Sequence, residues 1–125
     1  MHNQPSVSEL VRAVKNFVDK TAMPELSGRS GFHARVASNV LGTILRDLDA
    51  RESNDTREHA RLVALLDADP SLSLDELNAK LRQKIRSGEL TIQSAELMDH
   101  LKKTAIDQLK VDQPNYSALT KALEE

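Results

Sequence analysis

With 125 residues and a mass of 13.9 kDa, the chain has the length of one domain, and such a domain buries roughly two-thirds of its unfolded surface. Hydrophobic residues make up 39% and charged residues 29%, which excludes a disordered chain. The net charge of −2 argues against binding to nucleic acid or anionic lipid, because such proteins usually carry a basic excess. The absence of cysteine excludes disulfides, zinc fingers and thiol catalysis.

The amino-terminal segment Met1-His2-Asn3-Gln4-Pro5 has neither the basic nor the apolar region of a secretory signal. No apolar run approaches the roughly 18 residues that a membrane span needs. We therefore expect a cytoplasmic protein that makes no contact with a membrane.

The first helix is expected directly after this segment. Ser6 and Glu9 have the spacing of a capping box, and apolar residues then recur with a helical period. Pro24 disfavours helical backbone in the residue before it, so we expect the helix to end near Thr21. A loop over residues 24–31 should follow.

Two further helices are expected in the middle of the chain. The periodicity predicts a second helix over residues 31–49, which the polar residues 51–55 should end. The third helix then runs over residues 55–66, and the stretch 67–70, which ends in proline, stops it.

The carboxyl-terminal half repeats these signals. Ser73 and Glu76 again have capping-box spacing and predict the start of a fourth helix. Gly88 lies where the left-handed cap at the end of this helix is expected. A fifth helix should begin near Gln93 and stop at Pro114, followed by a short final helix.

No segment shows the alternation of a strand, so the fold class is all-α. We expect a single helical domain over residues 1–125, a bundle of about five helices. Its core should be aliphatic, because Phe17, Phe32 and Tyr116 are the chain's only aromatic residues. This scarcity also argues against single-stranded nucleic-acid binding, which uses aromatic stacking platforms.

The second helix carries one unusual position. At about 100° per residue, His33 lies in the middle of an apolar arc that covers more than half of the helix, so we expect this helix to be central in the bundle. Arg35 and Asn39 lie on the opposite side, where a neighbouring helix or a protein partner should contact them.

Two interpretations of the loop and helix start remain open. In the first, free amides of residues 31–33 bind a phosphate or carboxylate, with Arg29 and His33 in contact with the ligand. In the second, Ser30 caps the helix and His33 is a core histidine bonded to a backbone carbonyl. The loop lacks the glycine spacing and the lysine of a nucleotide-binding P-loop.

Other polar groups do not form a chemical site. The acidic residues between the second and third helices lack the spacing and the glycine of a calcium loop, so they indicate a solvated hinge: Asp47, Asp49, Glu52 and Asp55. His59 and His100 have no second histidine at ligand spacing and are expected at the surface. The sequence therefore predicts no catalytic residue, no metal site and no cofactor.

Four short stretches are similar to a known family: Phe32-His33-Ala34-Arg35-Val36-Ala37 with Asn39 and Leu41, Ile85-Arg86 before Gly88, His100-Leu101, and Val111-Asp112-Gln113-Pro114 with Tyr116. Over residues 10–116 the chain resembles a small bacterial helical family of unknown function. Its members tend to be encoded beside, or fused to, aminoglycoside-phosphotransferase-like kinases and acyl-CoA dehydrogenases. The resemblance implies a place in acyl-CoA or related carboxylic-acid metabolism, and it carries over no catalytic residue.

Together these observations favour a non-enzymatic accessory or interaction domain that works with a kinase-like or acyl-CoA dehydrogenase-like protein partner. The alternative is binding of a small anion or phosphate-bearing ligand by Arg29 and His33 at the 24–33 loop and helix start. Dimer formation stays open: an apolar helix face left uncovered by the other helices would indicate a homodimer.

Overall fold

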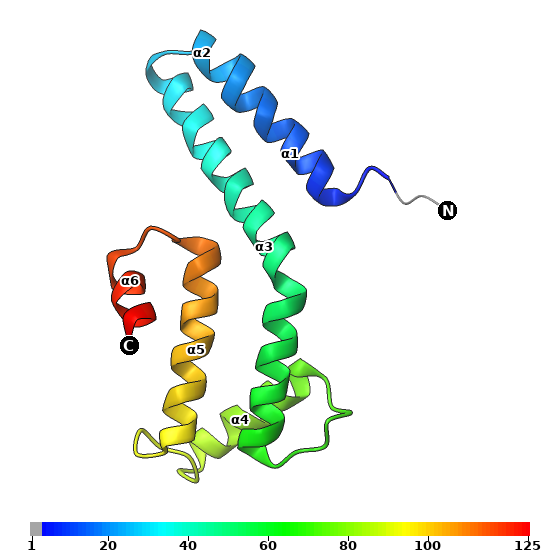
Figure 1. Cartoon of the computed structure of the whole chain (residues 1–125), viewed down its shortest axis with the longest axis vertical. Coiled ribbons are helices and arrows are strands. Elements are labelled where there is room, and N and C mark those ends of the chain that lie inside the picture. Colours follow the sequence, from blue (N-terminus) through cyan, green and yellow to red (C-terminus); the bar gives the residue numbers. More distant parts are fainter. Residues whose placement is uncertain (1–3) are drawn as a thin grey trace. The chain divides into compact units, whose positions relative to one another are not determined.

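The computed structural model describes residues 4–125, and over these residues the protein is helical, with no strand (Figure 1). The all-α fold class is therefore confirmed. Residues 1–3, which begin the segment expected to lack a secretory signal, lie outside the described residues. The elements are α1 (Val7–Phe17), the π-helical turn η1 (Val18–Ala22), α2 (Met23–Glu25), α3 (Gly28–Leu66), α4 (Leu74–Arg86), α5 (Ala95–Asp112) and α6 (Ser117–Glu124).

The chain forms two compact units, Met1–Ala50 and Arg51–Glu125. The N-terminal unit contains α1, η1, α2 and the first part of α3, whereas the C-terminal unit contains the rest of α3 together with α4, α5 and α6. Each unit has its own packing. The expectation of one domain over residues 1–125 stays a prediction.

Three helix ends lie where the capping signals place them. Ser6 Oγ accepts a hydrogen bond from the Glu9 amide (3.2 Å), and the Glu9 carboxylate accepts one from the Ser6 amide (2.7 Å). Ser73 and Glu76 form the same reciprocal pair at the start of α4. Gly88, just beyond α4, has a φ of +79°, which is the left-handed conformation expected of a helix-ending glycine.

The predicted end of the first helix near Thr21 is wrong, because helical backbone continues through Pro24 to the end of α2. The π-helical turn η1 explains this continuation. The Met23 amide donates to the carbonyl of Val18, five residues earlier, instead of to the carbonyl four residues earlier. Pro24 then lies in the first turn of α2, where proline is tolerated because the amide hydrogen that it lacks would have no partner within the helix.

The predicted break at residues 51–55 is also wrong, because α3 is one continuous helix. The stretch is polar but contains neither glycine nor proline, and polarity alone does not end a helix. Its side chains bond along the helix instead: Thr56 Oγ1 donates to the Glu52 carbonyl (2.8 Å), and Arg57 Nη2 donates to Asn54 Oδ1 (2.6 Å).

The C-terminal unit has an aliphatic core, as predicted. Leu62 and Leu77 are fully buried, with 0% of their surface exposed. They belong to a cluster that joins α3, α4 and α5: Leu62, Leu66, Leu77, Leu81 and Leu97. Val111 of α5 and Leu119 of α6 are buried as well.

The N-terminal unit has no such core. Among residues 4–50, Ser38 is the one buried residue, so the expectation that this part of α3 is a central helix is wrong. In Figure 1, α1 runs beside the first part of α3 as one arm of an antiparallel hairpin, and the Lys15 side chain bonds to Ser38 across it. A single neighbouring helix covers one side of α3. Leucines of this part of α3 are half-buried, and four large apolar residues stay exposed: Phe32, Val36, Val40 and Ile44.

Candidate functional site

The predicted ligand residues Arg29 and His33 lie in the first two turns of α3, and both are exposed. The His33 ring contacts the ring of Phe32 edge to face, with 5.6 Å between the ring centroids. The interpretation of His33 as a core histidine is therefore wrong. Its place on the apolar arc of the helix wheel is correct, but this arc is not covered in the N-terminal unit.

The start of α3 differs from the predicted anion cradle. The helix begins at Gly28, whose φ of +58° lets the chain reverse after α2, so Ser30 lies within the helix and does not cap it. The Gly31 amide, which was expected to bind the anion, donates instead to the Ser27 carbonyl (3.3 Å). Neither Arg29 nor His33 lines either of the two cavities described below. Anion binding by these two side chains stays a prediction.

Arg35 and Asn39 are exposed on α3, as a partner contact would require. They are four residues apart and share one face of the helix. The Asn39 carbonyl accepts a hydrogen bond from Thr43 Oγ1 (3.2 Å), an ordinary bond within the helix. Their role toward a partner stays a prediction.

A polar cluster that the sequence did not reveal joins the two helices of the hairpin. Lys15 Nζ donates to Asp19 Oδ2 (2.6 Å) and to Ser38 Oγ (3.1 Å), and Ser38 Oγ donates to Asp19 Oδ1. Ser38 is 6% exposed. We call these three residues the hairpin clamp: Lys15 from α1, Asp19 from η1 and Ser38 from α3.

The hairpin clamp stabilises charges and does not activate a nucleophile. The hydrogen bond from Lys15, followed by that from Ser38, lowers the pKa of Asp19 below its ordinary value of 3.8. An ammonium group has no lone pair with which to take a proton from Ser38. The Ser38 hydroxyl is also buried. The cluster is therefore a contact between helices and not a serine–lysine catalytic pair.

The outer surface of α1 is apolar. Four large side chains are 52–62% exposed, and at about 100° per residue they share an arc of about 80° on the helix: Val7, Leu10, Val14 and Phe17. The charged residues Glu9, Arg12 and Lys15 fall outside this arc. The helix thus presents an uncharged surface beside the hairpin clamp.

Two side chains of α3 extend this apolar surface. On α1, the apolar arc is rotated to one side of the half-buried Val11, which faces α3. On α3, Val40 (53% exposed) and Ile44 (40% exposed) are rotated in the same sense from Ser38, which faces α1. In an antiparallel pair, positions displaced in one rotational sense lie on one side of the pair. We call the combined surface the hairpin face: Val7, Leu10, Val14, Phe17, Val40 and Ile44. The exposed Phe32 and Val36 lie farther round α3.

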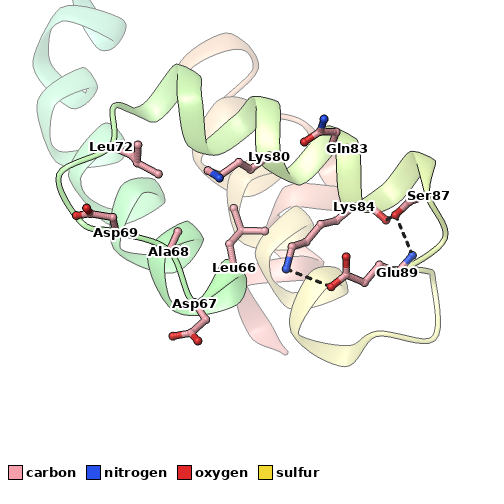
Figure 2. A pocket seen from close by; sticks show the side chains of 10 residues that line it. All are labelled: Leu66, Asp67, Ala68, Asp69, Leu72, Lys80, Gln83, Lys84, Ser87 and Glu89. Carbon is pink, nitrogen blue, oxygen red and sulfur yellow. Dashed lines mark hydrogen bonds and ion pairs between the residues drawn. The ribbon is translucent and has the colours of Figure 1, made fainter.

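The C-terminal unit contains an open cavity of about 830 Å³ between the end of α3 and α4 (Figure 2). Figure 2 shows Lys80 of α4 pointing toward the loop after α3 and Lys84 pointing toward Glu89, which follows α4. The distance between Lys84 Nζ and Glu89 Oε1 is 3.3 Å. Asp67 and Asp69 add further carboxylates to its lining. Three carboxylates thus stand against two ammonium groups in the lining. The one hydroxyl among the lining residues, Ser87 Oγ, donates to the Lys84 carbonyl (3.1 Å) and accepts from the Glu89 amide (3.4 Å), so backbone groups and not a side-chain base engage it.

A second cavity, of about 460 Å³, lies between α3 and α5, where Arg61 and His100 meet. His100, expected at the surface, is 4% exposed, so that expectation is wrong. Burial, followed by the positive charge of Arg61, lowers the pKa of His100 below its ordinary value of 6.5. His100 Nδ1 and Arg61 Nε are buried without a hydrogen-bond partner among the described residues. Two carboxylates, Glu96 and Asp99, also line this cavity and disfavour an anion.

Over residues 4–125, no three histidine, cysteine, aspartate or glutamate side chains come together in a way that could hold a metal ion. In the same residues, no helix has the length and apolar character to cross a bilayer. His59, the other histidine expected at the surface, is half-buried and has Nε2 2.8 Å from the Leu72 carbonyl. The hairpin face and hairpin clamp thus remain the most distinctive features of the described chain.

Fold and site together define a small all-α protein with an exposed apolar helix-pair surface. Residues 24–116 match the domain of unknown function DUF6285, and the chain belongs to this family. The match confirms the expectation of an uncharacterised family, and it begins after α1 and η1. Neither a curated protein nor a solved structure shows significant similarity to the chain.

Proposed function

We propose that this protein is a non-catalytic accessory protein that acts by binding another protein chain through the hairpin face. The observation that carries the proposal is the exposure of apolar side chains in the N-terminal unit. The charged hairpin clamp joins its two helices, whereas the six large apolar side chains of the hairpin face are 40–62% exposed. Soluble monomers rarely leave a contiguous apolar surface of this extent exposed, and such surfaces usually mark interaction sites.

The metabolic setting of the proposal comes from the family resemblance. Relatives encoded beside, or fused to, aminoglycoside-phosphotransferase-like kinases and acyl-CoA dehydrogenases imply an accessory role in acyl-CoA or carboxylic-acid metabolism. A kinase-like or acyl-CoA dehydrogenase-like enzyme is therefore the proposed protein partner. Because the hairpin face is uncharged, contact with it would depend on apolar burial and only weakly on salt.

The test is coexpression of the tagged chain with such a kinase and such a dehydrogenase encoded beside it. We expect one of them to copurify in a fixed ratio, and the Val14→Glu variant to lower its yield at least about tenfold, because a buried unpaired charge is costly at an interface. Asn16→Glu is the matched control, since Asn16 is exposed on the opposite side of α1 and receives the same charge. Absence of both enzymes from the purified wild-type protein would reject the accessory role.

A further inference from the structure

The six residues of the hairpin face form an uncharged surface of a defined size. At roughly 100 Å² of exposed surface for each half-exposed aliphatic or aromatic side chain, they present about 600 Å² per chain. Two such surfaces placed together would bury about 1,200 Å², which reaches the range of specific, stable protein–protein interfaces. The area buried between two hairpin faces is thus sufficient for a stable dimer.

The described part of the N-terminal unit buries no large apolar side chain completely. Over residues 4–50 Ser38 is the one buried residue, and apolar side chains such as Val11, Leu41 and Leu45 are half-buried. Helices gain most of their stability from packing of an amphipathic face, so a partner on the hairpin face would add to the stability of this unit. The chain has no cysteine, and its described residues form no metal site.

From these observations we infer that the hairpin face is covered by the hairpin face of a second copy of this chain. The inference rests on the proposed function and refines it: the chain that covers the hairpin face is a second copy, and the enzyme partner depends on the hairpin face because it contacts the dimer. An uncharged surface requires an uncharged partner surface, and a two-fold axis supplies one by pairing equal surfaces. Two antiparallel hairpins packed in this way form a four-helix bundle, in which outward apolar residues become the core. The enzyme partner would then bind the assembled bundle.

The hairpin clamp has a definite role in such a dimer. Side-chain bonds of Lys15 and Asp19 to Ser38 hold α1 against α3 at one position along the two helices. Buried polar groups of this kind are best known for setting register between helices. The clamp would therefore keep the apolar residues of α1 aligned with Val40 and Ile44, so that one rigid surface meets its copy.

The test is sedimentation equilibrium of the purified full chain without any enzyme partner. We expect twice the chain mass of 13.9 kDa for the wild type. The Val14→Glu variant should sediment as a monomer, with its dimer dissociation constant raised at least about 100-fold, because two copies would each bury a carboxylate. Asn16→Glu should remain a dimer.

Urea unfolding of the wild type at several protein concentrations tests the dimer even if the Val14→Glu variant does not fold. For a dimer, the urea midpoint of the wild type rises with protein concentration, whereas the midpoint of a monomer does not change. A wild type that is monomeric at millimolar concentration would overturn the inference. If Val14→Glu still prevented copurification of an enzyme partner in that case, the proposed function would stand with the enzyme on the hairpin face. A dimer that both variants leave intact would overturn the placement of the interface.

Discussion

The two units of the chain differ in how completely they bury their apolar side chains. In the C-terminal unit, leucines from α3, α4 and α5 meet in a closed core, and Leu62 and Leu77 have no exposed surface. In the N-terminal unit, the hairpin clamp joins the two helices beside half-buried apolar side chains such as Val11 and Leu45, and four large apolar side chains of α1 are more than half exposed. The C-terminal unit therefore has a closed apolar core, and the described part of the N-terminal unit does not.

Among the described residues, each unit contains one buried polar side chain, and these two residues differ in whether their hydrogen-bonding groups have partners. Ser38 has both of its hydrogen-bonding roles satisfied, because it donates to Asp19 and accepts from Lys15. His100 is equally buried, yet its Nδ1 atom has no partner among the described residues. The buried Ser38 therefore specifies the contact between α1 and α3, whereas the unpaired Nδ1 atom of the buried His100 lowers the stability of the C-terminal unit.

The largest expected effect comes from opening the leucine core. Leu62→Ala removes a fully buried side chain and should lower the free energy of unfolding of the C-terminal unit by about 2–5 kcal/mol. Urea unfolding followed by circular dichroism measures this loss. Leu101→Ala on α5, where the side chain is 42% exposed, is the control and should cost much less. Equal losses for the two variants would contradict a core centred on Leu62.

A smaller effect is expected from the hairpin clamp. Ser38→Ala leaves the 2.6 Å contact between Lys15 and Asp19 in place and removes the bonds that reach α3. We expect a loss of about 1 kcal/mol, since both charged partners remain partly accessible to water. Amide hydrogen exchange of α1 measures it, with the exposed Ser30→Ala as the control. Unchanged exchange in α1 would show that the clamp does not hold the helix.

The sequence predicted the capped helix starts and the ends near Leu66, Gly88 and Pro114 better than the two breaks near Thr21 and at residues 51–55. Both capping boxes are local patterns of four residues, and the structure confirms both. The expected ends near Thr21 and at residues 51–55 were wrong for physical reasons that a local rule does not contain. A π-helical turn accommodates Pro24, and side-chain bonds carry the helix through the polar stretch.

The candidate site was harder to predict, because burial depends on packing between distant residues. The apolar arc around His33 was identified correctly, but no local pattern tells whether a neighbour covers it. Lys15 and Ser38 are 23 residues apart, so their bond has no signal in either helix alone.

The smallest expected effect is a dependence of stability on pH through His100. Because the folded protein lowers the pKa of His100 below 6.5, mainly through burial, the unfolded chain binds a proton near pH 6.5 that the folded chain does not. Stability should therefore fall as pH decreases from about 6.5 toward the lowered value. Carboxylates with a lowered pKa, such as Asp19 and Glu76, lose their contribution only near and below their ordinary values of 3.8 and 4.5. Urea midpoints at pH 7.5 and 5.5 thus compare stability in a range in which these carboxylates do not titrate.

Two variants make this pH test specific to the buried ring. His100→Gln should reduce the difference between the two midpoints, whereas His33→Gln, at an exposed histidine of the N-terminal unit, should preserve it. An equal pH dependence in the wild type and in His100→Gln would contradict the assignment. A reduced dependence confined to His100→Gln would show that the buried polar group of the C-terminal unit lowers stability on protonation. The hairpin clamp of the N-terminal unit keeps its charges through the same pH range, because its carboxylate titrates below it.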